Sequence, residues 1–148
     1  MPCVSEILAN KDGYVFTIPP SAEVLEAVRK MNQRRIGALV VVDGETYPGR
    51  VVGMFTERDV LRLVGALQDV TSLRVGEVMT RDVVTVSPDA DIEEVQEIMK
   101  TRRIRHLPVV DRDGVLVGLV SIGDLNAWAV EHQARQLAGM HDYIFGRV

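Results

Sequence analysis

The sequence predicts an α+β fold in which one β-α-β-β-α unit occurs twice in tandem. The first observation is a repeated motif, Gly-hydrophobic-hydrophobic-Thr/Ser-x-x-Asp, at residues 53–59 and again at 118–124. The second is that each copy follows an aliphatic run that ends in Asp and a turn. The third is that the two copies align over whole units. The difference in residue number between them changes only at the longer turn of residues 44–49, where insertions are well tolerated. This pattern indicates a duplicated supersecondary unit.

The first copy is expected to form a strand, a helix, two strands and a second helix. Short aliphatic runs bounded by turn residues predict the strands. Apolar residues at helical spacing after Pro20 and Ser21 predict the first helix, and Thr56 is a residue type that commonly begins a helix. The five elements are expected at residues 15–17, 22–33, 38–42, 51–55 and 56–67.

The second copy repeats this order. Its first helix carries an apolar stripe that matches the one in the first copy, formed by Ile92, Val95, Ile98 and Met99. The strands and this helix are expected at residues 83–86, 92–101, 106–110 and 115–120, and a final helix is expected from Ile122 onward.

Between the copies lies a connector with an expected short helix at residues 75–79. The connector is too short and too apolar to act as a free linker, so the two halves should fold as one body. The chain is therefore expected to divide into a first repeat with an N-terminal extension, the connector, and a second repeat with a C-terminal helix, at residues 1–67, 68–80 and 81–148.

Composition narrows the class of protein. With 148 residues, 47% of them hydrophobic, the chain can bury a sizeable core. The net charge is −4, and the sequence lacks the clustered basic residues that are typical of nucleic-acid-binding proteins. No leader and no apolar segment of membrane-spanning length is evident, so we expect a soluble cytoplasmic protein. The Cys3 thiol is expected to have no catalytic or metal-binding role. Because the three histidines are scattered, at His106, His132 and His141, no metal site is expected.

The two motifs suggest chemistry as well as structure. A carboxylate one turn into a helix can accept hydrogen bonds from both hydroxyls of a ribose, a role that fits Asp59 and Asp124. A hydroxyl at the helix start, where free N–H groups favour an anion, can face a phosphate, a role that fits Thr56 and Ser121. The alternative is that each Thr/Ser-x-x-Asp only caps its helix, and the two roles are compatible.

These motifs, the order of the elements and the stretch Arg-Ile-Arg-His-Leu-Pro-Val-Val-Asp at residues 103–111 resemble the cystathionine-β-synthase (CBS) domain pair. The resemblance covers almost the whole chain and implies tandem CBS repeats packed sheet to sheet around a pseudo-two-fold axis. Within that family the chain looks like the stand-alone members. They imply a regulatory module that binds an adenosine nucleotide, namely AMP, ADP, ATP or NAD, or in some members S-adenosylmethionine, and that requires no cofactor.

The resemblance also implies which residues meet the ligand. The motif of one repeat faces basic residues of the other, which places Arg58 with Arg105 and His106 in a cation-rich cleft beside Asp59. The Asp124 cleft would have Gly37 and Ala38 at the matching positions, so phosphate there would depend on backbone N–H groups or on Arg34 and Arg35, and we expect weaker or different occupancy. Further candidates are Thr17 and Thr85, which strand-edge packing explains equally. Arg102 and Arg103 could be ordinary helix-end charges, and His106 could be a core residue.

The hypothesis is a stand-alone energy or redox sensor that reports nucleotide occupancy to an unidentified partner protein. The alternative is a nucleotide-independent adaptor whose helical faces bind another protein. No nucleophile elbow, phosphate loop or catalytic carboxylate pair is evident, so we do not expect an enzyme. The final helix fits either intramolecular packing or self-association, and the family resemblance favours a disc-like homodimer. The apolar residues of this helix are Leu125, Trp128, Ala129, Leu137, Met140, Tyr143 and Ile144.

Overall fold

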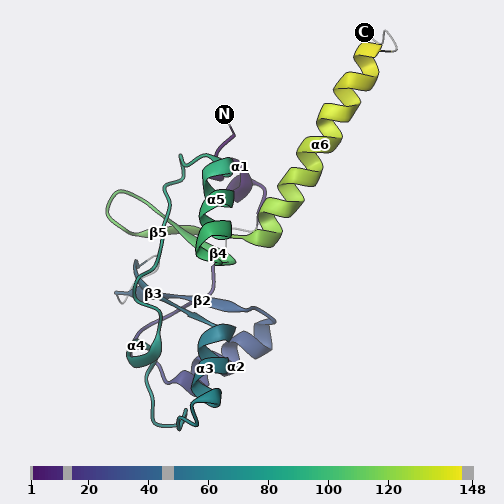
Figure 1. Ribbon diagram of the computed structural model, residues 1–148. Helices are drawn as coiled ribbons and strands as arrows, with labels where there is room; N and C mark the ends of the chain where they lie inside the picture. Colours follow the sequence, from purple (N-terminus) through teal and green to yellow (C-terminus); the bar gives the residue numbers. More distant parts are fainter. Residues whose placement is uncertain (1, 12–14, 45–48, 145–148) are drawn as a thin grey trace.

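The computed structural model describes residues 2–11, 15–44 and 49–144, with side chains as far as residue 140. It consists of two similar halves, each with a small sheet and its own helices, and a long C-terminal helix that points away from both (Figure 1). The first half contains β1 (Thr17–Ile18), α2 (Val24–Arg34), β2 (Ala38–Asp43), β3 (Arg50–Thr56) and α3 (Glu57–Gly65). The second contains α5 (Ile92–Arg102), β4 (His106–Val110), β5 (Leu116–Ser121) and α6 (Ile122–Ile144). The predicted α+β duplication is confirmed.

The strand predicted at residues 83–86 is wrong. In the first half, β1 pairs in parallel with β2, and the Val40 N–H donates to the carbonyl of Phe16 at 3.3 Å. The equivalent of Val40 in the second half is Pro108, which has no N–H to donate. The pairing there shrinks to one isolated bridge between Val86 and Val109. In the first half the predicted strand is shifted and short, covering only Thr17 and Ile18.

Two short helices, α1 (Val4–Ala9) and α4 (Val75–Val78), each pack on the half that they do not directly precede in the sequence. The sequence analysis did not predict α1. This helix packs against the second half, where the Val4 N–H donates to the carbonyl of Ala90 at 2.9 Å. Helix α4 packs against the first half through the equivalent bond, from the Val75 N–H to the carbonyl of Ala22 at 2.8 Å. Each half is therefore closed by the short helix that precedes the other half in the sequence.

Three apolar clusters hold the fold together. One fills each half, and the buried Val75 and Val4 place α4 and α1 in these two cores. The third cluster lies between the sheets and joins Val40 and Met54 of the first half to Leu116 of the second. An isolated bridge from Arg50 to Val115 connects the sheet edges. The two halves thus pack sheet to sheet as one body.

Apolar side chains remain exposed on two helices. Leu61, Val64 and Leu67 lie on or next to α3, and Val130, Leu137 and Met140 lie on α6. Among its described side chains, α6 packs against the core of the second half near its start, through the buried Leu125 and the partly buried Trp128. Tyr143 and Ile144, which the sequence analysis considered on this helix, and His141, considered there for a metal site, lie outside the described side chains. Within the described ranges, no helix has both the length and the apolar character needed to cross a bilayer.

The first residue of each motif is a glycine because a helix or its flanking segment packs directly onto it. A Cβ atom on Gly53 would lie 2.5 Å from the Met79 sulfur and 2.9 Å from the Thr80 carbonyl oxygen. A Cβ atom on Gly118 would lie 2.8 Å from a methyl group of Leu8. The same close approach therefore seats α4 on β3 and α1 on β5.

Substitution of either glycine by alanine should destabilise the protein by about 1–3 kcal/mol, the usual range for overpacking. Gly53→Ala should cost more than Gly118→Ala, because its Cβ meets a backbone oxygen and not only a flexible side chain. Urea denaturation followed by circular dichroism measures the difference. Gly139→Ala on α6, where the added atom meets nothing within 4 Å, is the control and should be neutral or stabilising. Equal stability of all three variants would contradict the packing.

Candidate functional site: two clefts between the repeats

Two clefts lie between the halves, one beside each motif. The Asp59 cleft has a volume of about 400 Å³ and is lined by residues of the first motif together with Val83, Val84 and the turn Arg103–His106 of the second half. The Ser121 cleft has a volume of about 450 Å³ and is lined by residues of the second motif together with Val15, Phe16 and the turn of residues 35–38 of the first half. Each cleft thus combines the motif of one repeat with the helix-to-strand turn of the other.

The turns that face the motifs are held by unusual backbone geometry. Helices α2 and α5 both end at an arginine in the left-handed region, Arg35 with φ 54° and Arg103 with φ 55°. The next residue closes each turn, since the N–H groups of Ile36 and Ile104 donate to Met31 and Met99 at 3.1 Å. Glycine is the usual residue at such a helix end, and a side chain there costs roughly 1–2 kcal/mol. Both arginines line a cleft.

Asp59 is buried and caps its own helix. Its Oδ2 accepts the Thr56 N–H at 2.9 Å, and the Asp59 N–H donates back to the Thr56 hydroxyl at 3.4 Å. Its Oδ1 accepts Arg62 Nη2 at 2.9 Å and the Thr80 hydroxyl at 3.3 Å. The capping interpretation is therefore confirmed here, and both carboxylate oxygens are engaged.

Asp124 caps α6 in the same way but is more accessible. Its Oδ2 accepts the Ser121 N–H at 2.8 Å and Lys11 Nζ at 2.7 Å, and its side chain is 21% exposed. Partial burial works against ionisation, but the hydrogen bonds from Lys11 and Ser121 outweigh it and hold the pKa of Asp124 below its ordinary value of 3.8. Within the described part of the chain, Oδ1 of Asp124 has no hydrogen-bond partner.

His106 and Gly37 line both clefts. Burial lowers the pKa of the His106 imidazole from 6.5, and the positive charge of Lys11 lowers it further. Asp124 and Glu57 act in the opposite direction without reversing the shift. The imidazole is therefore neutral at pH 7, on the wall that the two clefts share.

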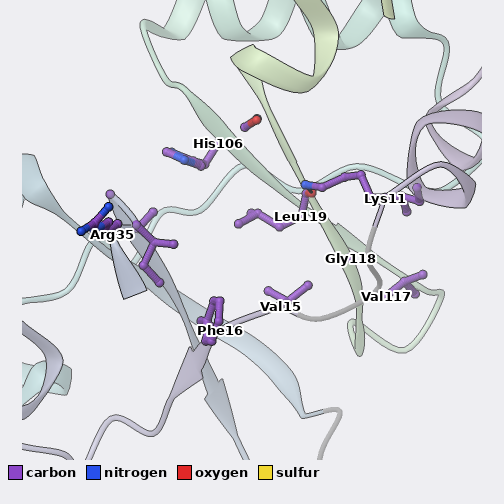
Figure 2. A pocket seen from close by; sticks show the side chains of 13 residues that line it. Lys11, Val15, Phe16, Arg35, His106, Val117, Gly118 and Leu119 are labelled. Carbon is purple, nitrogen blue, oxygen red and sulfur yellow. Dashed lines mark hydrogen bonds between the residues drawn. The ribbon is translucent and has the colours of Figure 1, made fainter. Parts of the chain in front are cut away.

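The clefts differ in their free cations. Arg58, Arg103 and Arg105 line the Asp59 cleft, and none of them has an ion-pair partner among the described residues. The carboxylates of Glu57 and Asp82 also line this cleft, so its charge is mixed. The Ser121 cleft has Arg35 and Lys11 on a mostly apolar wall, and Figure 2 shows Lys11 reaching Leu119 there.

The structure brings most of the sequence-predicted site residues to these clefts and leaves others outside. The Asp59 cleft gathers Thr56, Arg58, Asp59, Arg105, His106 and Gly37, and the Ser121 cleft gathers Ser121, Gly37, Ala38 and His106. Asp124 lines neither cleft, but it bonds Lys11 and Ser121, which both line the Ser121 cleft. Four other predicted residues also line neither cleft: Thr17, whose carbonyl oxygen accepts a hydrogen bond from Lys30, the exposed Thr85, Arg102, and Arg34, whose guanidinium lies over the Phe16 ring.

Lys11, Arg62 and Thr80 are polar partners of the two acids that the sequence analysis missed. Arg62 lies three residues after Asp59 on the same helix, a spacing that the sequence does reveal. Thr80 and Lys11 reach their acids across 21 and 113 residues, and no local pattern signals such contacts.

Comparison with known proteins connects this architecture to one family. The model of the family described as the CBS domain matches residues 4–66 and again residues 75–131. The CBS domain-containing protein YhcV of Bacillus subtilis is 34% identical over 136 residues, which cover 92% of this chain and 91% of that protein.

Two solved structures of similar fold contain bound ligands. The CBS domain protein PAE2072 from Pyrobaculum aerophilum, complexed with AMP, is 28% identical with a TM-score of 0.73, and the match covers 83% of this chain and 89% of that one. The CBS domain pair of protein MJ0100, complexed with 5-methylthioadenosine and S-adenosyl-L-methionine, is 25% identical with a TM-score of 0.74, covering 86% and 98%. Both neighbours therefore bind adenosine compounds.

The lowered pKa of Asp124 gives a pH dependence that can be measured. The ionised acid should stabilise the folded state above pH 4, and this contribution should disappear as the pH falls through the folded pKa. Asp124→Asn should therefore lower the free energy of unfolding at pH 7 by about 1–2 kcal/mol and by less as the pH falls below 4. Denaturant unfolding from pH 7 to pH 3 measures this trend. Asp113→Asn on an exposed loop is the control, and a loss that does not change with pH would contradict the assignment.

Proposed function

We propose that this chain, which belongs to the CBS domain family, is a stand-alone regulatory module that binds an adenosine nucleotide in the clefts between its repeats. The main support is the Asp59 cleft, where three guanidinium groups without ion-pair partners among the described residues lie beside an apolar wall. Its volume falls within the usual range for small-ligand sites. The adenosine ligands of the two similar structures add support for this ligand class.

The arrangement supports a defined orientation of the nucleotide in the Asp59 cleft. Val83, Val84 and Ile104 offer an apolar surface for the flat base. Phosphate groups would meet Arg58, Arg105 and the start of α3, where a helix favours negative charge. A ribose hydroxyl reaches Asp59 only if Arg62 or Thr80 releases Oδ1, and the Arg62 side chain is 59% exposed and therefore able to move.

The proposed role is that of an energy or redox sensor. Its ligand would be AMP, ADP, ATP or NAD, and binding would favour one packing of the repeats over another, because a ligand shifts an equilibrium only by binding its states unequally. Proteins made of CBS domains alone are regulatory in type, and we propose no catalytic step and no required cofactor. We also propose that the protein acts in the cytoplasm and regulates a partner protein, whose identity the proposal does not specify.

The adaptor alternative has one observation in its favour. Both motif acids are already bonded to their own helices, as helix caps without a ligand would be. Titration with nucleotides separates the two functions, because an adaptor would bind a protein partner but show no saturable nucleotide binding.

The first test is calorimetric titration with AMP. Arg105→Ala should weaken AMP binding about tenfold, since a hydrogen bond from a charged group to phosphate is typically worth 1.5–3 kcal/mol. Arg102→Ala is the matched control, because Arg102 lies three residues away and lines neither cleft. The proposal is wrong if the unmodified protein binds neither AMP, ATP nor NAD at millimolar concentration. Equal affinity of both variants would remove Arg105 from the phosphate site.

We also propose that the protein is a homodimer that uses α6. The exposed row of Val130, Leu137 and Met140 on a helix that leaves the body offers an apolar surface for a second copy. Leu137→Glu should shift the protein to monomer in analytical ultracentrifugation, because it would bury a charge in the interface. Ala138→Glu places the same charge on another side of the helix and should leave the dimer intact. A monomer at all concentrations of the unmodified protein would rule this assembly out.

A further inference from the structure

The Asp59 cleft is lined by acids as well as by arginines. Asp59 itself is buried and paired with Arg62, so these two charges neutralise each other. Glu57 and Asp82 also line the cleft, and both residues are exposed. Neither of their carboxylates has a hydrogen-bond or ion-pair partner among the described residues. Two uncompensated negative charges therefore lie in a cleft that is otherwise suited to an anion.

Glu57 lies where an anionic ligand would otherwise be most favoured. It is the first residue of α3, and the N-terminal end of a helix attracts negative charge. A Cβ atom on Gly37 would lie between 3.2 and 3.4 Å from the three atoms of the Glu57 carboxylate, which places this acid against the wall that the two clefts share. The equivalent residue at the start of α6 is the uncharged Ile122. The acid is therefore particular to the Asp59 cleft.

The charges that line this cleft leave only a small positive excess. The arginines that line it without an ion-pair partner among the described residues are Arg58, Arg103 and Arg105. The free carboxylates of Glu57 and Asp82 oppose them, so three positive charges face two negative ones. A phosphate monoester carries about −1.5 to −2 charges at pH 7, which already exceeds this difference. Any further phosphate group would enter a site that has become negative.

We propose that Glu57 and Asp82 are specificity-determining residues that make the Asp59 cleft prefer AMP to ATP. The arginines bind one phosphate group, and the two acids repel the phosphates that ATP adds to it. Unpaired charges that exclude a competing ligand are a common source of specificity. This inference rests on the proposed function and deepens it by choosing among its nucleotides. Because both acids are exposed, salt screens them, so the preference weakens as the ionic strength rises.

The test is titration with AMP and with ATP at low salt, without Mg²⁺, which would mask phosphate charge. The backbone amide resonance of Val84 reports on the Asp59 cleft, and that of Gly118 reports on the Ser121 cleft. At Val84 the unmodified protein should bind AMP about tenfold more tightly than ATP, and less selectively in about 0.5 M NaCl. Glu57→Gln and Asp82→Asn keep the side-chain shape and remove the charge. Each should raise the affinity for ATP several-fold and the affinity for AMP less.

Glu94→Gln is the matched control. It removes the same charge from the exposed surface of α5 and lines neither cleft, so the ratio of the AMP and ATP affinities should not change. Tighter binding of ATP than of AMP by the unmodified protein overturns the inference, and so does an unchanged ratio in both cleft variants. AMP binding reported only at Gly118 overturns it while the proposed function stands. No response at either amide to AMP, ATP or NAD refutes the proposed function itself.

Discussion

The arrangement of both clefts depends on a carboxylate that caps its own helix. Asp59 and Asp124 each accept the backbone N–H of the Thr or Ser just before their helix, which fixes where α3 and α6 start relative to the strands before them. These helix starts form the cleft walls that face the opposite repeat. Because the acids are part of the fold, a ligand that engages them also acts on the helix starts. Binding at these acids would therefore be coupled to helix position by the same side chain.

The duplication gives the clefts one architecture but not one chemistry. The first motif carries its own arginine partner, whereas the second depends on a lysine from the far end of the chain. The left-handed arginines at the ends of α2 and α5 occupy equivalent places in both clefts at a cost in backbone strain. Neutral His106 lies on the shared wall, close enough to the charges of both sides for each to affect its pKa. A change in charge in one cleft is therefore felt at the boundary of the other.

The sequence was sufficient to predict features that depend on local pattern. The repeat and the helix caps follow from residue types at fixed spacing, and the pairing of each motif with the opposite turn was implied by the family resemblance. The prediction of a strand at residues 83–86 was wrong because Pro108, on the neighbouring strand, has no N–H to donate to this segment. No local pattern of residues 83–86 reveals this. Helix α1 was overlooked because it is short and gains its stability by packing against residues more than 80 positions away. Lys11 was missed for a similar reason, because its partner, Asp124, is 113 residues away in the sequence.

The crossed placement of α1 and α4 has a consequence for chains that carry a single copy. Such a chain would hold a leading helix that, as in this structure, does not pack on its own sheet, and its core would stay open on one side. Two such chains could close their cores by donating leading helices to each other, which is domain swapping. The smallest stable form of an undoubled ancestor would then be an exchanged pair of polypeptides. Gene fusion would have converted that intermolecular exchange into the internal one seen here.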